Sequence, residues 1–155
     1  MTNSENTFTG EFAYSIDTKG RVNIPAKFRA SLSVDNDRTF VITKGLDPCV
    51  YAYPLSIWQQ QIESALRSLS SLSMVNRHFI RGIVRYASTV TYDKQGRIQL
   101  TPILIEHAQL EKDVLIIGMV NKIEIWNPQQ LQAFEARAEE LDQNDYNALA
   151  EKITL

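Results

Sequence analysis

The feature that most constrains this chain is a short signature that occurs twice. Residues 17–24 read Asp-Thr-Lys-Gly-Arg-Val-Asn-Ile, and residues 93–100 read Asp-Lys-Gln-Gly-Arg-Ile-Gln-Leu. Both copies follow the pattern Asp-x-x-Gly-Arg-aliphatic-polar-aliphatic. An internal repeat of this detail indicates one structural unit used twice, so the two Arg side chains are expected in equivalent places. A chain that offers the same basic group twice is suited to a repetitive partner.

Each signature predicts a tight turn inside a β-hairpin. Apolar and polar residues alternate loosely before the turn and strictly after it, as they do in strands with one buried face. An Asp at the first turn position accepts hydrogen bonds from nearby backbone N–H groups, and a Gly at the fourth position takes a positive φ. We therefore expect the Asp of each turn to shape it, and Asp17 to orient Arg21. The motif-structural residues of the two turns are Asp17, Gly20, Asp93 and Gly96.

The rest of the chain repeats the same order of elements. In the first half we expect a short helix over 26–32, strands over 40–43 and 50–53, and a helix from Pro54 that breaks at the serines of 68–73, followed by a second helix over 75–85. In the second half we expect strands over 88–92, 97–100, 114–118 and 123–126, a helix after Asn127-Pro128 that carries Leu131 and Phe134, and a last amphipathic segment over 146–153. The fold class that follows is α+β, with a mainly β core and flanking helices.

Charge is distributed unevenly along the chain. The formal net charge of −2 argues against a uniformly basic nucleic-acid binder. Residues 18–33 nevertheless contain four basic residues and no acidic one, and acidic residues gather near the C-terminus. In the helix expected over 75–85, Arg77, Arg81 and Arg85 form a basic stripe. This stripe suits contact with DNA, contact with the acidic C-terminal helix across a subunit interface, or a solvated helix face.

Bulk properties favour a folded, cytoplasmic protein. The 155 residues are 44% hydrophobic and 22% charged, a balance that argues against general disorder. No apolar run is long enough to cross a bilayer, and residues 1–6 lack the basic and apolar stretches of a secretory signal. The single cysteine, Cys49, cannot form an intramolecular disulfide, which fits a reducing compartment.

At this point the residues resemble a known family. The twin signatures, Tyr53-Pro54-Leu55 with Trp58 after the first unit, and Glu124-Ile125-Trp126 after the second are similar to the MraZ family of bacterial transcriptional regulators. The resemblance covers residues 10–141. It implies two AbrB/SpoVT-like swapped-hairpin modules, over 11–57 and 87–130, intertwined in one β-barrel. Linking helices would then occupy 58–86, and a C-terminal helical segment 131–155.

The resemblance also implies a function. Family members form ring-shaped homo-oligomers and bind direct repeats of double-stranded DNA in the promoter of their own division and cell-wall operon, usually as repressors. A cytoplasmic, nucleoid-associated protein is therefore expected, without an enzymatic activity, a cofactor, a metal or a small-molecule ligand. The family's Asp-x-x-x-Arg motif maps here onto Asp17 with Arg21 and onto Asp93 with Arg97.

The candidate DNA-binding residues are basic and lie in or just after the two turns: Lys19, Arg21, Lys27, Arg29, Lys94 and Arg97. An arginine that begins a strand after a tight turn suits bidentate contact with phosphate or a guanine edge. The lysines and Arg29 are expected to position the protein on phosphates. Because Lys27 and Arg29 follow the first turn without basic counterparts in residues 103–106, the first hairpin is expected to carry more of the contact. Each of these residues could instead be an ordinary surface charge.

Other function classes receive weaker support. His78 and His107 lie too far apart in the sequence to suggest a metal site, and no phosphate-binding loop is present. Cys49 is expected to be a small buried apolar residue and not a nucleophile. The aromatic residues Tyr53, Trp58, Trp126 and Phe134 are expected in a core or an interface. The alternative to a DNA-binding regulator is a non-enzymatic ring-forming scaffold that binds protein partners. Ring size, operator sequence and the sign of regulation stay open.

Overall fold

A computed structural model describes residues 5–155 of the chain. Its first half contains β1 (Phe8–Ser15), β2 (Arg21–Asn23), α1 (Ala26–Ser31), η1 (Val34–Asn36), β3 (Thr39–Lys44), β4 (Val50–Pro54), α2 (Leu55–Ile57), η2 (Trp58–Glu63), α3 (Ser64–Arg67) and α4 (Met74–Val84). The second half contains β5 (Ser88–Thr91), β6 (Arg97–Gln99), α5 (Pro102–His107), β7 (Asp113–Val120), β8 (Ile123–Trp126), α6 (Pro128–Glu135), η3 (Ala136–Glu140) and α7 (Gln143–Lys152). Of the N-terminal stretch expected to lack a secretory signal, residues 1–4 lie outside the described part of the chain.

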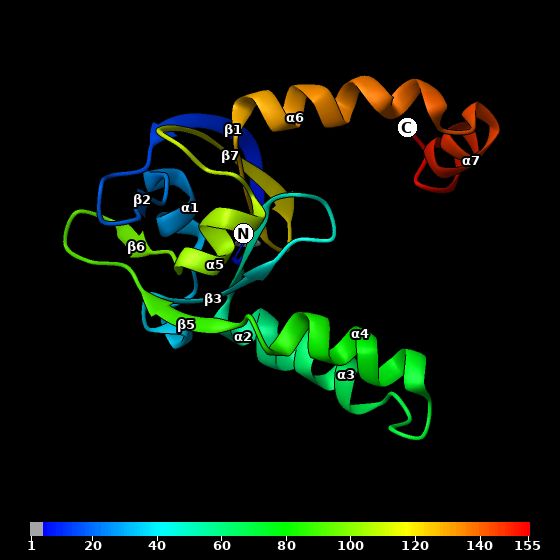
Figure 1. Cartoon of the computed structure of the whole chain (residues 1–155), viewed down its shortest axis with the longest axis horizontal. Coiled ribbons are helices and arrows are strands. Elements are labelled where there is room, and N and C mark those ends of the chain that lie inside the picture. Colours follow the sequence, from blue (N-terminus) through cyan, green and yellow to red (C-terminus); the bar gives the residue numbers. More distant parts are fainter. Residues whose placement is uncertain (1–4) are drawn as a thin grey trace.

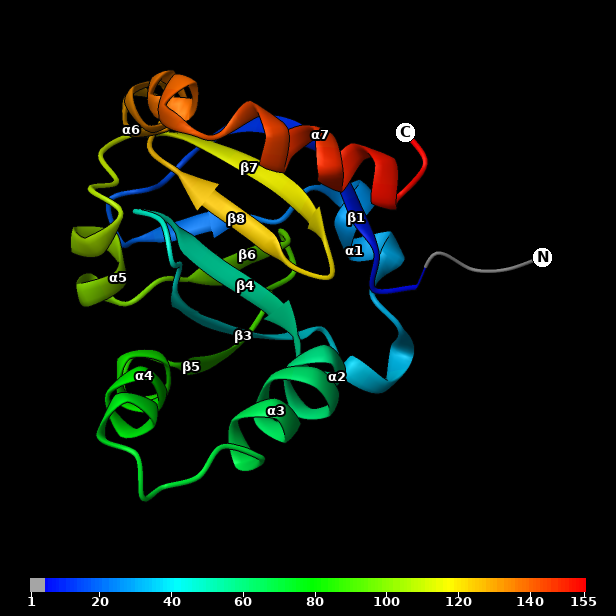
Figure 2. The ribbon, with the colours of Figure 1, turned by 90° about the vertical axis from the view of Figure 1, so that its right-hand side faces the viewer.

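The strands of residues 5–155 form one six-stranded antiparallel sheet and one two-stranded ribbon. The order in the sheet is β1-β7-β8-β4-β3-β5, and β2 pairs with β6 in the ribbon. The fold is thus mixed α and β with a mainly antiparallel β core (Figures 1 and 2). Over residues 5–155 the sheet is open, with β1 and β5 at its edges, and does not close into a barrel.

Strand pairing joins the two halves of the chain. The first-half strands β1, β2 and β4 pair with the second-half strands β7, β6 and β8, and β5 returns to pair with β3. Within the first predicted hairpin, the isolated bridge between Ile16 and Val22 is the described pairing. The expected turns are present, but the strands on either side of each turn pair mostly with strands from the other half of the chain. Period-two patterning shows which face of a strand is buried and says nothing about its neighbour.

Within the described part of the chain, two apolar clusters hold the fold together. The larger cluster fills the space between the sheet and the ribbon, and its fully buried members include Phe8, Val22, Phe28, Ile98 and Leu104. The second cluster covers the opposite face of the sheet and contains Tyr53, Trp58 and Trp126, against which Phe134 packs. The aromatic residues expected in a core therefore do lie in one, and buried Cys49 belongs to the same cluster.

The helices form two projections from this core. The helix expected from Pro54 is continuous but has a π-helical middle, η2, where Trp58 Nε1 donates a hydrogen bond of 3.0 Å to Glu63 Oε1. After the serine-rich turn, α4 runs back toward the sheet (Figure 1), and Figure 2 shows α3 and α4 as the two separated arms of a helical hairpin. On the other side α6, η3 and α7 form an arm that extends away from the sheet (Figure 1). No helix within residues 5–155 has the length and apolar character needed to span a membrane.

Candidate nucleic-acid interface

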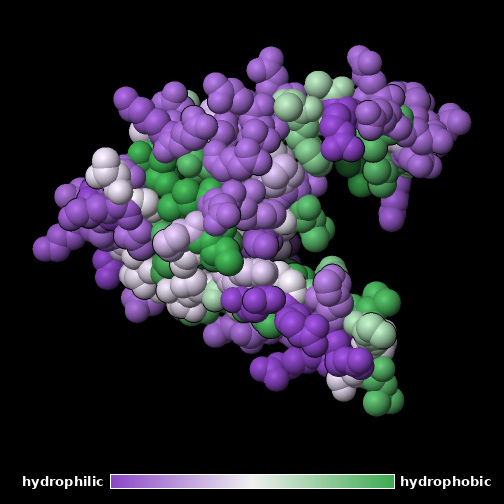
Figure 3. Space-filling model, in the orientation of Figure 1, coloured by the Kyte–Doolittle hydropathy of each residue, from purple (hydrophilic) through white to green (hydrophobic). Residues whose placement is uncertain are grey.

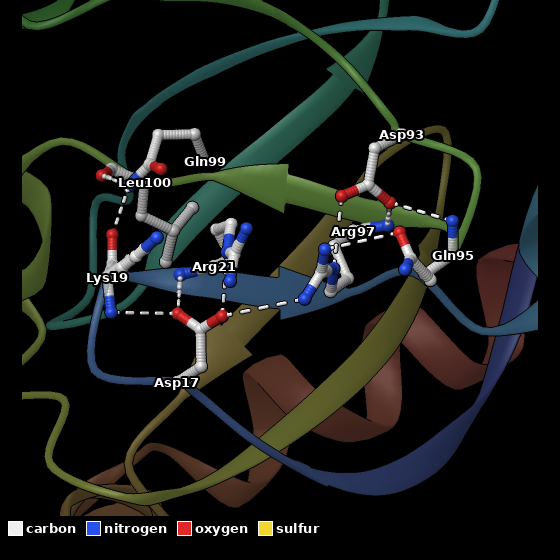
Figure 4. Close-up of polar contacts among 8 residues, drawn as sticks. All are labelled: Asp17, Lys19, Arg21, Asp93, Gln95, Arg97, Gln99 and Leu100. Atoms are coloured by element: carbon white, nitrogen blue, oxygen red, sulfur yellow. Dashed lines mark hydrogen bonds and ion pairs between the residues drawn. The ribbon is translucent and has the colours of Figure 1, made fainter.

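The ribbon of β2 and β6 brings the two signatures together. Val22 faces Ile98, and both side chains are fully buried. Their neighbours pair symmetrically, Arg21 with Gln99 and Asn23 with Arg97. Because side chains alternate along a strand, these four polar residues share the face of the ribbon that points away from the core. The two turns lie at opposite ends of the ribbon, as Figure 4 shows.

Asp17 builds the first turn. Its Oδ1 accepts hydrogen bonds from the backbone N–H of Lys19 (2.9 Å) and of Arg21 (2.8 Å). Its Oδ2 accepts a hydrogen bond of 2.7 Å from Arg21 Nε. The backbone N–H of Gly20 donates to the carbonyl of Asp17 at 3.0 Å and closes the turn, with φ of +79° at Gly20. The carboxylate thus fixes both the loop and the direction of the Arg21 side chain.

The second turn repeats this geometry. Asp93 Oδ1 accepts from the backbone N–H of Gln95 (2.9 Å) and of Arg97 (3.0 Å), and Oδ2 accepts from Arg97 Nε at 3.0 Å. In both turns the hydrogen bond from the arginine backbone N–H is the main reason why the pKa of the aspartate lies below its usual value. Each carboxylate is therefore ionised at neutral pH and neutralises part of the charge of its own arginine.

Each turn is also held by the strand of the other repeat. The Asn23 side chain donates to the carbonyl of Gln95 at 2.9 Å, and the Gln99 side chain donates to the carbonyl of Lys19 at 2.6 Å. Backbone hydrogen bonds from Ile24 to Gly96 (2.8 Å) and from Leu100 to Gly20 (2.9 Å) complete the reciprocal contact. Sequence reasoning missed these amides, although the polar position between two aliphatic residues recurs in both signatures.

The two arginines differ in how many acceptors they meet. Arg97 donates through Nε to Asp93, its Nη1 lies 3.7 Å from Asp17 Oδ2, and its Nη2 donates to Gln95 Oε1 at 3.2 Å. Arg21 binds Asp17 through Nε, and its two Nη groups have no partner among residues 5–155. Its side chain is 31% exposed, against 24% for Arg97. Figure 4 shows both guanidinium groups above the ribbon.

The remaining candidate cations lie in different surroundings. Lys19 and Lys94 are exposed at the tips of the two turns. Lys27 is also exposed, but its Nζ donates to the carbonyl of Thr9 on β1 at 3.1 Å. Arg29 is half-buried and donates through Nε to the carbonyl of Ile24 at 3.0 Å. Lys27 and Arg29 are therefore already bound within the chain, whereas the two turn lysines are open to solvent.

Arg29 lies against the second turn, not the first. A Cβ added to Gly96 would be 2.6 Å from Arg29 Nε, and the guanidinium also lies over the ring of Tyr92, 5.9 Å from its centroid. At the first turn the matching position is taken by Ile105, whose Cδ1 would lie 3.0 Å from a Cβ on Gly20. Because β2 and β6 are exchanged between the halves, the helix that follows one turn in sequence supports the other turn. The sequence order of Arg29 after the first turn thus does not give its place in space.

The other groups considered from the sequence are placed away from this ribbon. Burial raises the pKa of the Cys49 thiol strongly, so the thiol is a poor nucleophile at neutral pH. Within the described residues no group of three or more His, Cys, Asp or Glu side chains could hold a metal ion. Of the basic stripe on α4, Arg77 donates to the carbonyl of Ser71 at 2.8 Å, and Arg85 lies over the ring of Tyr86.

Comparison with known proteins agrees with the repeated architecture. Residues 7–81 and 83–152 each match the family described as MraZ protein, antitoxin-like. Proteins named transcriptional regulator MraZ from Pediococcus pentosaceus and Natranaerobius thermophilus are 41% and 42% identical to this chain over 146 residues. Each alignment covers 94% of this chain and 96% of the relative. A relative of the same name from Acetivibrio thermocellus is 40% identical over 149 residues, which cover 96% of this chain and 97% of the relative. The chain therefore belongs to the MraZ family of transcriptional regulators.

Proposed function

We propose that this chain is a sequence-specific DNA-binding regulator of transcription and that the ribbon of β2 and β6 is its DNA-contacting surface. The observation that carries the proposal is the state of Arg21. Asp17 holds its Nε, while both Nη groups are unpartnered within residues 5–155 and point away from the core. A guanidinium fixed at one edge and free at the other is prepared for a bidentate bond to a phosphate or to the O6 and N7 of guanine.

The other cations are proposed to support this contact to different degrees, according to how free their donor groups are. Lys19 and Lys94, exposed at the turn tips, are proposed to bind phosphates on either side of the ribbon. Arg97 belongs to the same surface, but a DNA contact would have to compete with Asp93, Asp17 and Gln95 for its donors. Lys27 and Arg29 are proposed to contribute long-range attraction for phosphate in addition to their bonds within the chain. The first turn is therefore proposed as the main contact, because its arginine is the freer of the two.

A chain with a net charge of −2 is expected to bind DNA weakly as a single copy. We therefore propose that it acts as a ring-shaped homo-oligomer that presents Arg21 many times to direct repeats of double-stranded DNA. Linked contacts raise the overall affinity through effective concentration, by 10²–10⁴ in order of magnitude. By its family relationship the proposed target is the promoter of its own division and cell-wall operon, and the proposed effect is repression. A cytoplasmic, nucleoid-associated location follows from this function.

The test is fluorescence anisotropy with the promoter of the protein's own operon and with the same DNA after its repeats have been scrambled. We expect preference for the repeat-containing DNA and a steep loss of affinity as salt rises, because phosphate contacts release counterions. Arg137→Ala, on the exposed η3 segment of the arm, is the matched control for loss of one arginine. Absence of binding at low salt, or equal binding to scrambled DNA, would refute the proposal.

The second candidate function is a non-enzymatic scaffold that binds protein partners. It is favoured by one observation, the exposed apolar side chains on α4 and α7. A scaffold would assemble without preference for the promoter DNA, and Arg21→Ala would then leave every measured property unchanged. The anisotropy measurement therefore separates the two functions.

A further inference from the structure

The C-terminal helix α7 exposes an apolar face. No residue of α7 is buried, and its side chains Tyr146 and Leu149 are 66% and 63% exposed. With Ile153, which follows the last helical residue, they recur at the spacing of a single helical stripe. A helix of ten residues is marginal in water unless a surface covers such a stripe. The geometry of α7 therefore calls for an apolar partner surface.

Carboxylates lie beside this stripe. Asp145 precedes Leu149 by four residues and Lys152 follows it by three, so both charges are on the same side as the stripe. Asp142 is the N-cap of α7, and its Oδ1 accepts a hydrogen bond of 2.7 Å from the backbone N–H of Asn144. Glu151 has neither a three- nor a four-residue spacing to the three apolar residues, so it lies on another side of the helix. The partner surface expected for α7 is apolar in the middle, with positive charge where it meets the N-terminal end of the helix, which carries Asp142 and Asp145.

A groove of this kind lies between the outer face of the sheet and the α3–α4 hairpin. Its volume is about 250 Å³. Its apolar and aromatic walls include Tyr51, Tyr53, Leu66, Phe79 and Ile83. Among residues 5–155, the cations that line it are Lys44 and Lys122. Lys122 Nζ lies 5.2 Å from the centroid of the Tyr51 ring, so its charge is held at the groove.

The groove and α7 do not meet within one chain. Figure 1 shows α7 at the far end of the arm, separated from the α3–α4 hairpin that borders the groove. In Figure 3, hydrophobic surface is visible both at the end of that hairpin and on the side of the arm that faces it. In the single chain the stripe of α7 is exposed, and the lining of the groove includes Phe79, which is 46% exposed.

We propose that α7 of one copy docks in this groove of a second copy. The apolar stripe of α7 would cover Phe79 and Ile83, and Asp142 and Asp145 would face Lys44 and Lys122. The proposal rests on the homo-oligomer proposed above and names its interface. Arm and groove are different surfaces, so each copy donates one arm and accepts another. Such a head-to-tail contact repeats from copy to copy and closes into a ring when the rotation between copies allows it.

A helix suits the groove better than a small molecule. Leu46 and Phe79, both in the groove lining, are 78% and 46% exposed. Small-molecule sites bury most of their ligand in a closed, concave pocket, whereas this lining is open on one side. The open side leaves the apolar lining accessible to side chains of a helix laid across it.

Cross-linking between differently tagged copies tests the contact directly. One copy carries Leu149→Cys, the other Phe79→Cys, and a short bis-maleimide reagent links them; the native Cys49 is buried in both. We expect a link between copies that is at least several-fold more abundant than the link obtained when Glu151→Cys replaces Leu149→Cys. Equal yields for positions 149 and 151 would overturn the proposal. So would a doubly substituted chain that links only within itself.

Native mass spectrometry of charge-reversal variants tests the docking site separately from the proposed homo-oligomer. Asp145→Lys and Lys122→Glu should each raise the dissociation concentration of the oligomer by at least about tenfold, which corresponds to about 1.4 kcal/mol. The double variant should recover much of the loss, and Glu151→Lys should have no effect.

If all variants assemble as the parent does, the docking site is wrong and the assembly stands. If the parent chain is single at every concentration, the proposed assembly itself fails. A small-molecule adduct on the parent that Phe79→Ala abolishes would assign the groove to a ligand and overturn the proposal.

Discussion

Arg97 Nη1 lies 3.7 Å from Asp17 Oδ2, so the arginine of the second turn is ion-paired with the aspartate of the first. The same arginine binds its own Asp93 at 3.0 Å. Among residues 5–155 the reciprocal pair, Arg21 with Asp93, is not formed. Two turns with the same sequence pattern and the same backbone hydrogen bonds therefore carry arginines in different states. One arginine joins the two repeats, and the other keeps its terminal donors free.

This difference predicts unequal effects of the two arginine substitutions on DNA binding. Arg21→Ala should cost about 1–3 kcal/mol for each contact that is lost. The loss of affinity should exceed that figure in an assembly, because the contact is repeated around it. Anisotropy with repeat-containing promoter DNA measures the effect, and thermal unfolding should change little because Arg21 is half-buried at the surface.

Arg97→Ala provides the comparison. We expect a smaller direct loss of DNA contact and a larger loss of stability than for Arg21→Ala, since Arg97 meets Asp93, Asp17 and Gln95. Pairs this exposed contribute about 0–1 kcal/mol each, so the change in stability should stay near 1 kcal/mol. Equal DNA binding by Arg21→Ala and the parent protein would rule out the first turn as the main contact.

The local chemistry of the two turns could be read from the sequence. Asp, Gly and Arg at fixed offsets act through bonds within five residues, so the pattern of residues 17–21 and 93–97 is sufficient to predict them. The α+β class, the helix break at 68–73 and the buried aromatic cluster likewise follow from local patterning. The division into modules at 11–57 and 87–130 stays a prediction.

The pairing of the strands, and the contacts between residues far apart in the sequence, could not be derived from the sequence in the same way. The pairing of β1 with β7 and of β2 with β6 depends on contacts between distant parts of the chain, which side-chain alternation does not encode. For the same reason Arg29, which follows the first turn in sequence, was expected to support that turn and lies against the second. The contact between Arg97 and Asp17 also exists only after the strands have been exchanged.

The position of Arg29 predicts a coupling with Gly96. Gly96→Ala should destabilise the protein by about 1–2 kcal/mol from the positive φ, and the new methyl group must also displace the guanidinium. In an Arg29→Ala background the second part of the cost disappears, so urea unfolding should show that the double variant is destabilised by less than the sum of the two single variants. Gly82→Ala, which meets no atom within 4 Å in helix α4, is the control and should raise stability by about 0.5–1 kcal/mol. Additive effects of Gly96→Ala and Arg29→Ala would contradict the proposed contact.

The turn aspartates predict how stability depends on acid. Folding lowers the pKa of Asp17 and Asp93 from the ordinary value of 3.8. Their stabilising contribution is therefore fully present above that value and is lost as pH falls through the lower pKa of the folded state. The double variant Asp17→Asn with Asp93→Asn should lose less stability than the parent between neutral pH and about pH 2. Urea unfolding across this range measures the difference, and Asp113→Asn on β7 serves as the control. A parallel acid response of parent and double variant would show that the turn carboxylates are not stabilised on folding.

Glu124 predicts a pH dependence of the opposite sign. Burial raises its pKa above the ordinary value of 4.5, although its Oε1 accepts a hydrogen bond of 2.8 Å from Trp126 Nε1 and Lys122 lies nearby. The folded state therefore favours the protonated carboxyl, and its contribution to stability is lost as pH rises through the raised pKa. Glu124→Gln keeps the acceptor for Trp126 without the charge, so it should be more stable than the parent at neutral pH, with the difference vanishing below about pH 4. Glu124→Leu leaves the indole N–H unpaired and should instead cost about 1–3 kcal/mol at both pH values. A Glu124→Gln protein that is less stable than the parent at neutral pH would mean that the ionised carboxylate is favoured by its surroundings.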